Sequence, residues 1–404
     1  MMKRSGSADL PLHYGSVPPW LAERMSKLGL AIVETIASEF SPAEVVRKIS
    51  DPFWFQSLGA VMGMDWHSSG ITTSVMGALK KSVNPHAKEL GIHICGGKGK
   101  HSLQTPNELL SVGDRTGLNG KDLARASRLT AKVDNNAIQD GFQLYLHSFI
   151  VSATGEWAVI QQGMNADNKM ARRYHWHSEN LTSFVEEPHA FIYGQPQGKI
   201  LNLTDHRAQQ LRTSTLDISR EHPEKMLKEI KQLVMPSHHD VRMEDVNLKR
   251  LGAMLWLAHE RQPADFSELL LLEGMGPRSI QSLALVSEVI YGMPSRFEDP
   301  ARFSFAHGGK DGHPFPVPVN VYDETISTLR IAIDKAKIGN SDKLAAIRKL
   351  TQIAQDAEKD FIPNTNFKEV IARERRESYK YGGRTIFGKA KPPSDTDNGQ
   401  LSLF

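Results

Sequence analysis

Apolar residues recur at helical spacing along most of this chain. Near its start, Trp20, Met25, Leu28 and Ile32 fall on one face of a helix, and prolines stand where its first turn begins. A Ser or Asp cap followed by a proline predicts further helix starts at residues 42 and 52. Helical spacing returns beyond residue 204. The pattern therefore predicts a mainly helical protein.

Strand spacing is confined to the middle of the chain. Residues 142–151 are rich in aromatic and branched apolar side chains, and residues 157–162 form a second such run after a turn. Shorter runs at 189–193 and 199–203 predict another strand pair, and residues 91–95 predict one more strand upstream. Short strands joined by tight turns indicate a small antiparallel sheet.

These patterns together predict an α+β fold that is mainly helical, with the small antiparallel sheet in the central region. The sheet would be flanked by a helical N-terminal part and a helical C-terminal part. The expected organisation is a flexible arm at 1–16, a helical N-terminal region at 17–130, a sheet region with a candidate active site at 131–203, a helical domain at 204–365, a basic segment at 366–391 and a disordered tail at 392–404.

Composition narrows the class of protein. Of 404 residues, 40% are hydrophobic and 24% are charged, as in an ordinary globular chain. The single cysteine, Cys95, excludes an intrachain disulfide and a zinc site built from several thiolates. No secretory signal is recognised, and no apolar run approaches the roughly 20 residues of a membrane span. We therefore expect a cytoplasmic protein with no membrane partner.

Polar side chains crowd the ends of the predicted hairpin. Carboxylates, amides and imidazoles in such a group suit acid–base or metal-assisted chemistry. The candidate catalytic residues are Asp134, Asp140, Gln143, His147, Gln161, His175 and His177. One of the three histidines would serve as general base. Oxygen ligands suit Mg²⁺ or Mn²⁺, and the candidate metal ligands are Asp134, Asp140, Glu186 and Glu187. The alternative is a solvated sheet edge without chemistry.

A glycine-containing turn between two apolar helices lies within residues 265–292. The segment LLLLEGMGPRSIQSLALV resembles the helix-hairpin-helix motif of DNA-repair proteins. Gly274 and Gly276 permit a tight turn that leaves backbone N–H groups free at the next helix start. These groups, with Arg278 and Ser279, would hold one DNA phosphate without reading sequence. An ordinary helical hairpin is the alternative.

Other basic residues are candidates for contacts with the DNA backbone. A glycine-rich loop carries Lys98 and Lys100, and the central region carries Arg172 and Arg173. Residues 367–391 contain eight basic and three acidic residues with aromatics interleaved, a composition that suits nucleic acid and includes Arg375 and Arg376. A solvated basic helix would explain that last segment equally well.

The C-terminal pentapeptide follows a polar linker. It resembles the short peptide by which bacterial replication and repair proteins bind the sliding clamp, and it consists of Gln400, Leu401, Ser402, Leu403 and Phe404. The glutamine would supply a polar anchor and the apolar side chains would fill a pocket. The alternative is a C-terminal strand that docks on its own domain.

Several longer strings resemble one known family. They include DPFWFQSLGAVMGMDWHSSGITT, AKVDNNAIQDGFQLYLHSFIV, ARRYHWHS and DPARFSFAHGGKDGHPFPV. They are similar to the bacterial and archaeal family catalogued as domain of unknown function 763, over roughly residues 10–390. That resemblance carries no activity, so function has to be inferred from the residues.

The sequence predicts a DNA-binding repair or replication enzyme. The first hypothesis is a metal-dependent nuclease that recognises DNA structure and is tethered to the sliding clamp. The second is a DNA glycosylase or lyase in which Asp299 or Lys132 carries the chemistry. The third is a non-catalytic DNA-binding adaptor held at the clamp.

Overall fold

A computed structural model describes most of the chain. The described residues are 17–64, 69–167, 170–179, 181–194, 197–230, 248–301, 319–336, 338–358, 384–385 and 388–389. The chain divides into two compact units, residues 1–355 and 356–404. In the second unit, strands β6 (Arg384–Thr385) and β7 (Gly388–Lys389) pair antiparallel. The expected arm at 1–16, Arg375, Arg376 and the C-terminal pentapeptide lie outside the described residues.

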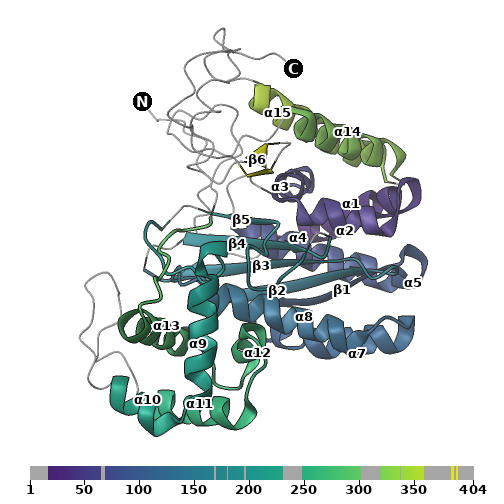
Figure 1. Cartoon of the computed structure of the whole chain (residues 1–404). Coiled ribbons are helices and arrows are strands. Elements are labelled where there is room, and N and C mark those ends of the chain that lie inside the picture. Colours follow the sequence, from purple (N-terminus) through teal and green to yellow (C-terminus); the bar gives the residue numbers. More distant parts are fainter. Residues whose placement is uncertain are drawn as a thin grey trace, which may run out of the picture. The chain divides into compact units, whose positions relative to one another are not determined.

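The first unit is built on a five-stranded antiparallel sheet (Figure 1). Its strands follow one another in chain order: β1 (Ile92–Lys98), β2 (Gln143–Ser152), β3 (Trp157–Asn165), β4 (Met170–His177) and β5 (Phe191–Tyr193). Each strand pairs with the next, and β2 and β3 form the predicted hairpin. The expected mainly helical α+β fold with a small central sheet is therefore confirmed.

The prediction of the sheet was wrong in two places. The segment that forms β4 was not expected to be a strand, because its arginines and histidines suggested an exposed polar rim. Residues 199–203, expected to form a strand, make only isolated bridges, Leu201 with Phe297 and Asn202 with Ile138. Charged residues are compatible with a central strand when neighbouring elements supply partners, which only the folded chain can do.

Helices from both ends of the first unit lie on one side of the sheet (Figure 1). They are α1 (Pro19–Glu39), α2 (Pro42–Ser50), α3 (Pro52–Val61), α4 (Gly70–Val83), α14 (Val319–Lys335) and α15 (Asn340–Glu358). Of these, α2 and α4 contact the strands, and α14 packs on α1 and α3. The predicted caps are present: Ser41 Oγ accepts a hydrogen bond from the Glu44 amide at 3.0 Å, and Asp51 Oδ1 accepts one from the Trp54 amide at 2.6 Å. Ile150 and Ile160 of the sheet join this core.

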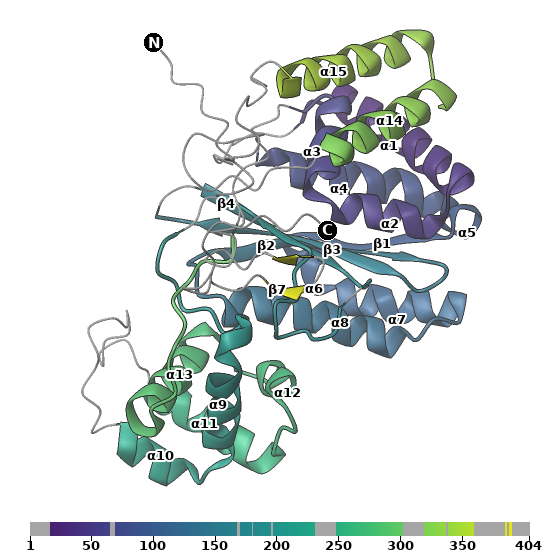
Figure 2. The ribbon, with the colours of Figure 1, turned by 45° about the horizontal axis from the view of Figure 1, so that its top comes forward.

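The opposite side of the sheet carries the larger remaining helices of the first unit (Figure 2). Residues Phe149, Trp157 and Trp176 point into this second core. The larger helices here are α7 (Thr105–Thr116), α8 (Gly120–Lys132), α9 (Gln209–Arg220), α10 (Pro223–Ile230), α11 (Leu248–Arg261), α12 (Phe266–Leu271) and α13 (Pro277–Tyr291). A π-helical turn, η2 (Val133–Ala137), continues α8.

Short helical segments complete the first unit. They are η1 (Asn84–His86), α5 (Ala87–Leu90), α6 (Lys100–Leu103) and η3 (His206–Ala208). Among the described helices, none combines the length and the apolar character that crossing a membrane requires. Because both faces of the sheet are covered, the polar side chains of its central strands lie inside the protein and need internal partners.

Candidate functional site

A buried carboxylate, Asp134, is the centre of a hydrogen-bond network on the α8 face of the sheet. It lies in the π-helical turn η2 and has no exposed surface. Its Oδ2 accepts bonds from Gln161 Nε2 at 2.5 Å and from Trp176 Nε1 at 3.0 Å, while Oδ1 lies 2.5 Å from His189 Nε2. Burial raises the pKa of the Asp134 carboxyl, and its contact with His189 opposes that rise.

The network continues from Gln161 to His147 and Ser127. Because the Gln161 amide donates to Asp134, its oxygen must accept a bond from His147 Nδ1, at 2.8 Å. His147 Nε2 then accepts a bond from the Ser127 hydroxyl at 2.8 Å. Burial lowers the pKa of His147 to about 4, so this imidazole is neutral at pH 7. It orients Gln161 and does not reach a pocket surface that the structure describes.

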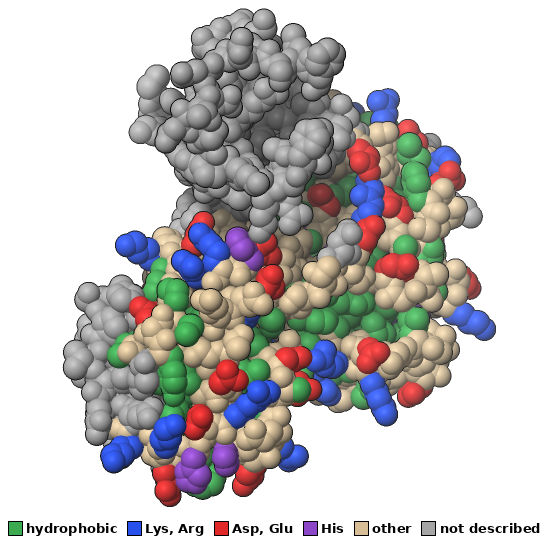
Figure 3. All heavy atoms as spheres, viewed as in Figure 1, with side chains coloured by type: hydrophobic (Ala, Val, Ile, Leu, Met, Phe, Trp, Pro, Cys, Tyr) green, Lys and Arg blue, Asp and Glu red, His purple; other side chains and the backbone are tan. Residues whose placement is uncertain are grey.

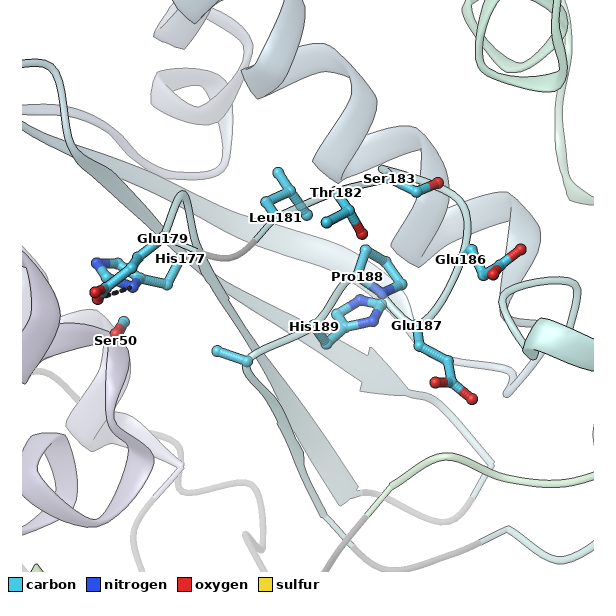
Figure 4. Close-up of a pocket in the computed structure, with 11 residues that line it drawn as sticks. Ser50, His177, Glu179, Leu181, Thr182, Ser183, Glu186, Glu187, Pro188 and His189 are labelled. Carbon is cyan, nitrogen blue, oxygen red and sulfur yellow. Dashed lines mark ion pairs between the residues drawn. The ribbon is translucent and has the colours of Figure 1, made fainter. Parts of the chain in front are cut away.

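His189 connects this network to a pocket. The pocket has a volume of about 310 Å³ and is lined by the loop 181–190, the end of β4 and Ser50. Figure 4 shows His189 beside Pro188 in the loop, with the His177–Glu179 ion pair on the opposite side of the view. With Nε2 bonded to Asp134, His189 has Nδ1 left for a molecule in the pocket. An Asp–His pair of this kind can orient an imidazole as a general base.

A second buried group forms around Arg172 on the same face. Its guanidinium contacts Asp140 Oδ2 at 2.8 Å and Asp299 Oδ2 at 2.7 Å, and Tyr174 donates to Asp140 at 2.7 Å. The three charged side chains are no more than 2% exposed. Burial raises the pKa of Asp140, and Arg172 opposes that effect. Asp299, the expected glycosylase carboxylate, also accepts a hydrogen bond from the backbone amide of Ala301. Its ion pair with Arg172 of β4 attaches this segment to the sheet.

Arg173 and His175 lie on the other face of the sheet, toward α3 and α4. Arg173 donates to His175 Nε2 at 2.7 Å and to Gln56 at 3.0 Å, and its guanidinium lies over the Phe55 ring at 4.8 Å. Burial lowers the pKa of Arg173 to about 10, and burial together with Arg173 holds the pKa of His175 well below its usual range. The sheet therefore separates His175 from Asp134, and the two do not share one catalytic group as expected.

The four carboxylates proposed as metal ligands have separate partners. Asp134 and Asp140 belong to the two buried networks, Glu186 pairs with Arg212, and Glu187 Oε1 lies 2.6 Å from His206 Nδ1. Among the described residues, no group of three or more His, Cys, Asp or Glu side chains is placed to hold a metal ion. Glu186 and Glu187 do line the His189 pocket together.

The loop that forms this pocket has an unusual backbone at Glu187. Its φ is +42°, in the left-handed region that side-chain-bearing residues seldom adopt. The Glu187 amide donates to Thr204 O at 2.7 Å, which holds the conformation. Such local strain, on the order of 1 kcal/mol, is found at binding and catalytic loops more often than elsewhere.

The segment resembling a helix-hairpin-helix forms α12, a short turn and α13. Gly274 has a φ of +78° and is exposed, and Arg278 is exposed and donates to Gln281 at 3.3 Å. The turn is attached to the Asp134 segment, because Met275 O accepts from Lys132 Nζ at 2.8 Å and from Asn136 Nδ2 at 3.3 Å. The structure thus links residues that are 143 and 139 positions apart in the sequence. Burial lowers the pKa of Lys132.

The other residues expected to bind DNA differ in accessibility. Lys98 and Lys100 are exposed at the end of β1 and the start of α6. The side chain of Arg172 and that of Arg173 have no exposed surface, so the expectation that they contact DNA is wrong. Ser279 is only 7% exposed, which leaves the Arg278 side chain as the accessible polar group at the start of α13.

His177 and Gln143 are the remaining predicted catalytic residues. His177 lines the His189 pocket, and burial lowers its pKa. Gln143 is exposed at the start of β2 and belongs to neither buried network. The prediction did not include His189 among the catalytic residues, although it follows Glu186 and Glu187 closely in the sequence. Its pairing with Asp134 spans 55 residues, and no local pattern encodes it.

Comparison with known proteins gives one match. The family described as protein of unknown function (DUF763) matches residues 6–317. No curated protein and no solved structure matches the chain. The matched region contains all five strands of the sheet, Asp134, His189 and the hairpin between α12 and α13. Since this match covers well over half of the sequence, the chain belongs to the DUF763 family.

Proposed function

We propose that this protein is a DNA-directed hydrolase in which His189 is the general base and Asp134 orients it. The observation that carries the proposal is the 2.5 Å contact between a fully buried carboxylate and an imidazole that lines a pocket of about 310 Å³. A positioned general base contributes about 10²–10⁴-fold to a rate.

The proposed chemistry uses the free nitrogen of the imidazole. His189 Nδ1 takes a proton from a water molecule in the pocket while that water attacks a phosphodiester phosphorus. The bond from phosphorus to a sugar oxygen breaks, and the leaving oxygen takes a proton from solvent. Asp134 stabilises the imidazolium, and two hydrogen bonds to its Oδ2, from Gln161 and Trp176, favour its ionised form.

The DNA part of the proposal is supported by the turn between α12 and α13. Gly274 and Arg278 are exposed there, where they suit a DNA phosphate. The same turn bonds to Lys132 and Asn136, which flank Asp134 in the chain. A phosphate held at the turn would therefore be fixed relative to the segment that carries Asp134.

The proposal also includes a bound metal ion and binding to the replication sliding clamp. Glu186 and Glu187 line the pocket with His189 but are paired with Arg212 and His206, and the described residues form no metal-binding group of three. Mg²⁺ or Mn²⁺ would bind there only if both carboxylates left these partners, and the ion would then polarise the same water. Binding to the replication sliding clamp through residues 400–404 would bring the enzyme to newly made DNA. Deletion of these five residues should abolish co-elution with the clamp and leave DNA affinity unchanged; unchanged co-elution refutes this part.

The central experiment compares DNA cleavage by matched variants. Purified full-length protein is incubated with labelled branched, nicked, mismatched and damaged-base DNA in Mg²⁺, Mn²⁺ or EDTA. His189→Gln should lower the cleavage rate at least about 100-fold without loss of folding, whereas His222→Gln, at an exposed histidine on the α10 side, should have no effect. Full activity of His189→Gln, or binding without turnover under every condition, would refute the proposal.

A lyase reaction at Lys132 is the second candidate. Burial lowers the pKa of the Lys132 amine, which favours the neutral nucleophile, and the amine lies at the hairpin turn. Such a reaction would persist in EDTA, act only at damaged bases and form a borohydride-trapped covalent complex. Absence of a trapped complex with damaged-base DNA excludes this candidate.

A further inference from the structure

Helix α8 carries a stripe of basic side chains. We call it the α8 stripe: Lys121, Arg125, Arg128 and Lys132. Their spacing of four, three and four residues places them on one helical face. At 1.5 Å per residue the stripe is about 16 Å long. The first three residues are exposed, and among the described residues none of the three has an ion-pair partner.

A pocket with an aromatic floor opens beside the N-terminal half of this helix. Its volume is about 450 Å³, and its lining includes Asn119, Asp122, Arg125, Trp157 and Phe184. The Trp157 and Phe184 rings are nearly parallel, with 9° between their planes and 6.1 Å between centroids. Figure 3 shows an apolar area near the middle of the viewed face, with acidic and basic side chains around it.

The stripe and the pocket together point to one class of ligand. We propose that they form a binding track for single-stranded DNA, in which one base enters the pocket and the following phosphates lie along the α8 stripe. The choice of DNA as the ligand rests on the proposed function. The inference adds that the bound DNA is single-stranded. Basic side chains along a backbone and aromatic rings beneath bases are the two features that single-strand binding needs.

A single strand fits this arrangement better than a duplex for a physical reason. In a duplex both faces of a base are already stacked, so a base would have to leave the helix at a cost of a few kcal/mol before it could enter the pocket. In a single strand that cost is smaller, and stacking on the partly exposed Phe184 ring is gained. Asn119 and Asp122, whose side chains are hydrogen-bonded to each other, also line the pocket.

The track leads toward the candidate active site. The stripe ends at Lys132, which bonds the hairpin turn and lies two residues before Asp134. At the other end, Phe184 belongs to the same loop as Ser183 and Glu186, which line the His189 pocket. A base held against Phe184 would therefore position the neighbouring nucleotides on the loop that carries the proposed general base.

The test measures affinity of the full-length protein for labelled oligonucleotides of one length. Single-stranded DNA, duplex DNA and single-stranded RNA are compared over a series of salt concentrations by fluorescence anisotropy. Arg125→Gln with Arg128→Gln should weaken single-stranded DNA binding and lower the slope of log K against log salt concentration by about 1.4. The matched control is Lys81→Gln with Lys88→Gln, two exposed lysines away from α8, which should bind as the wild type does.

The aromatic floor is tested separately. Phe184→Leu should weaken single-stranded DNA binding about tenfold through lost stacking. Stacking on Phe184 should quench the fluorescence of a 2-aminopurine base in a bound oligonucleotide, and the Phe184→Leu variant should lack this quenching. Phe40→Leu, at a 55% exposed aromatic residue that follows the last residue of α1, serves as the control. Thermal unfolding of each variant confirms that the comparison is made between folded proteins.

The possible outcomes separate this inference from the proposed function. Wild-type affinity in the double arginine variant, or equal affinity for duplex and single strand, overturns the track. Tighter binding of RNA than of DNA overturns the choice of DNA. If the track variants lose binding while no DNA is cleaved under any condition, the hydrolase proposal fails and the track stands. If His189-dependent cleavage occurs and the track variants bind normally, only the track fails.

Discussion

Substitution of Asp299 tests directly whether this residue has a structural role or a catalytic one. Its carboxylate accepts two bonds from Arg172, at 2.7 and 3.1 Å, while Asp140 keeps a third contact with the same guanidinium at 2.8 Å. Since all three side chains are buried, we expect the free energy of unfolding to decrease when any of them is changed. The size of the decrease depends on which charge is left unpaired.

The magnitudes follow from the geometry. Asp299→Asn removes charge-assisted bonds worth about 1.5–3 kcal/mol each, but Asn keeps one acceptor and Arg172 keeps Asp140, so the expected loss is about 2–3 kcal/mol. Arg172→Met leaves two carboxylates without a cation, and breaking such a buried group costs about 3–5 kcal/mol. In the Met background, Asp299→Asn should be neutral or stabilising, because it removes one unpaired buried charge.

Urea unfolding followed by tryptophan fluorescence measures these differences as a double-mutant cycle. The expected coupling between Asp299 and Arg172 is at least about 2 kcal/mol. Asp217→Asn is the control, because this carboxylate is 64% exposed and should contribute less than about 0.5 kcal/mol. A fully stable Asp299→Asn variant that has lost its activity would refute the structural role and revive Asp299 as a catalytic residue.

Two further predictions concern the core around His147. Its pKa of about 4 lies below the usual 6.5, so between these values the unfolded chain binds a proton that the folded chain does not. Protonation of His147 in the unfolded chain should therefore lower the free energy of unfolding by about 3 kcal/mol from pH 7 to pH 4. Urea titrations of His147→Gln should show a pH dependence that is smaller by this amount. If the variant and the wild type have the same pH dependence, the prediction is wrong. Gly96→Ala should destabilise the fold by more than about 2 kcal/mol, because φ is +85° and a Cβ would stand 2.2 Å from His147 O. A melting temperature within error of the wild type would disprove this.

Local sequence determined the helices and the central hairpin. The caps Ser41 and Asp51 and the proline at residue 277 place helix starts without reference to the rest of the chain. Strands β2 and β3 were predicted because their runs of apolar residues are long and joined by a short turn. These signals depend on interactions between residues near in sequence, so they can be recognised before the fold is known.

Tertiary structure decided which polar residues meet. Arg172 and Arg173 are adjacent in sequence, yet the alternation of β4 sends one to Asp140 and Asp299 and the other to Gln56 on the opposite face. The Asp134–His189 pair and the contact between Lys132 and the hairpin turn join segments that are distant in the chain. Burial by layers on both sides of the sheet makes these contacts necessary, because each buried charge needs a partner. A sequence shows the charges, but the packing of the layers determines their partners.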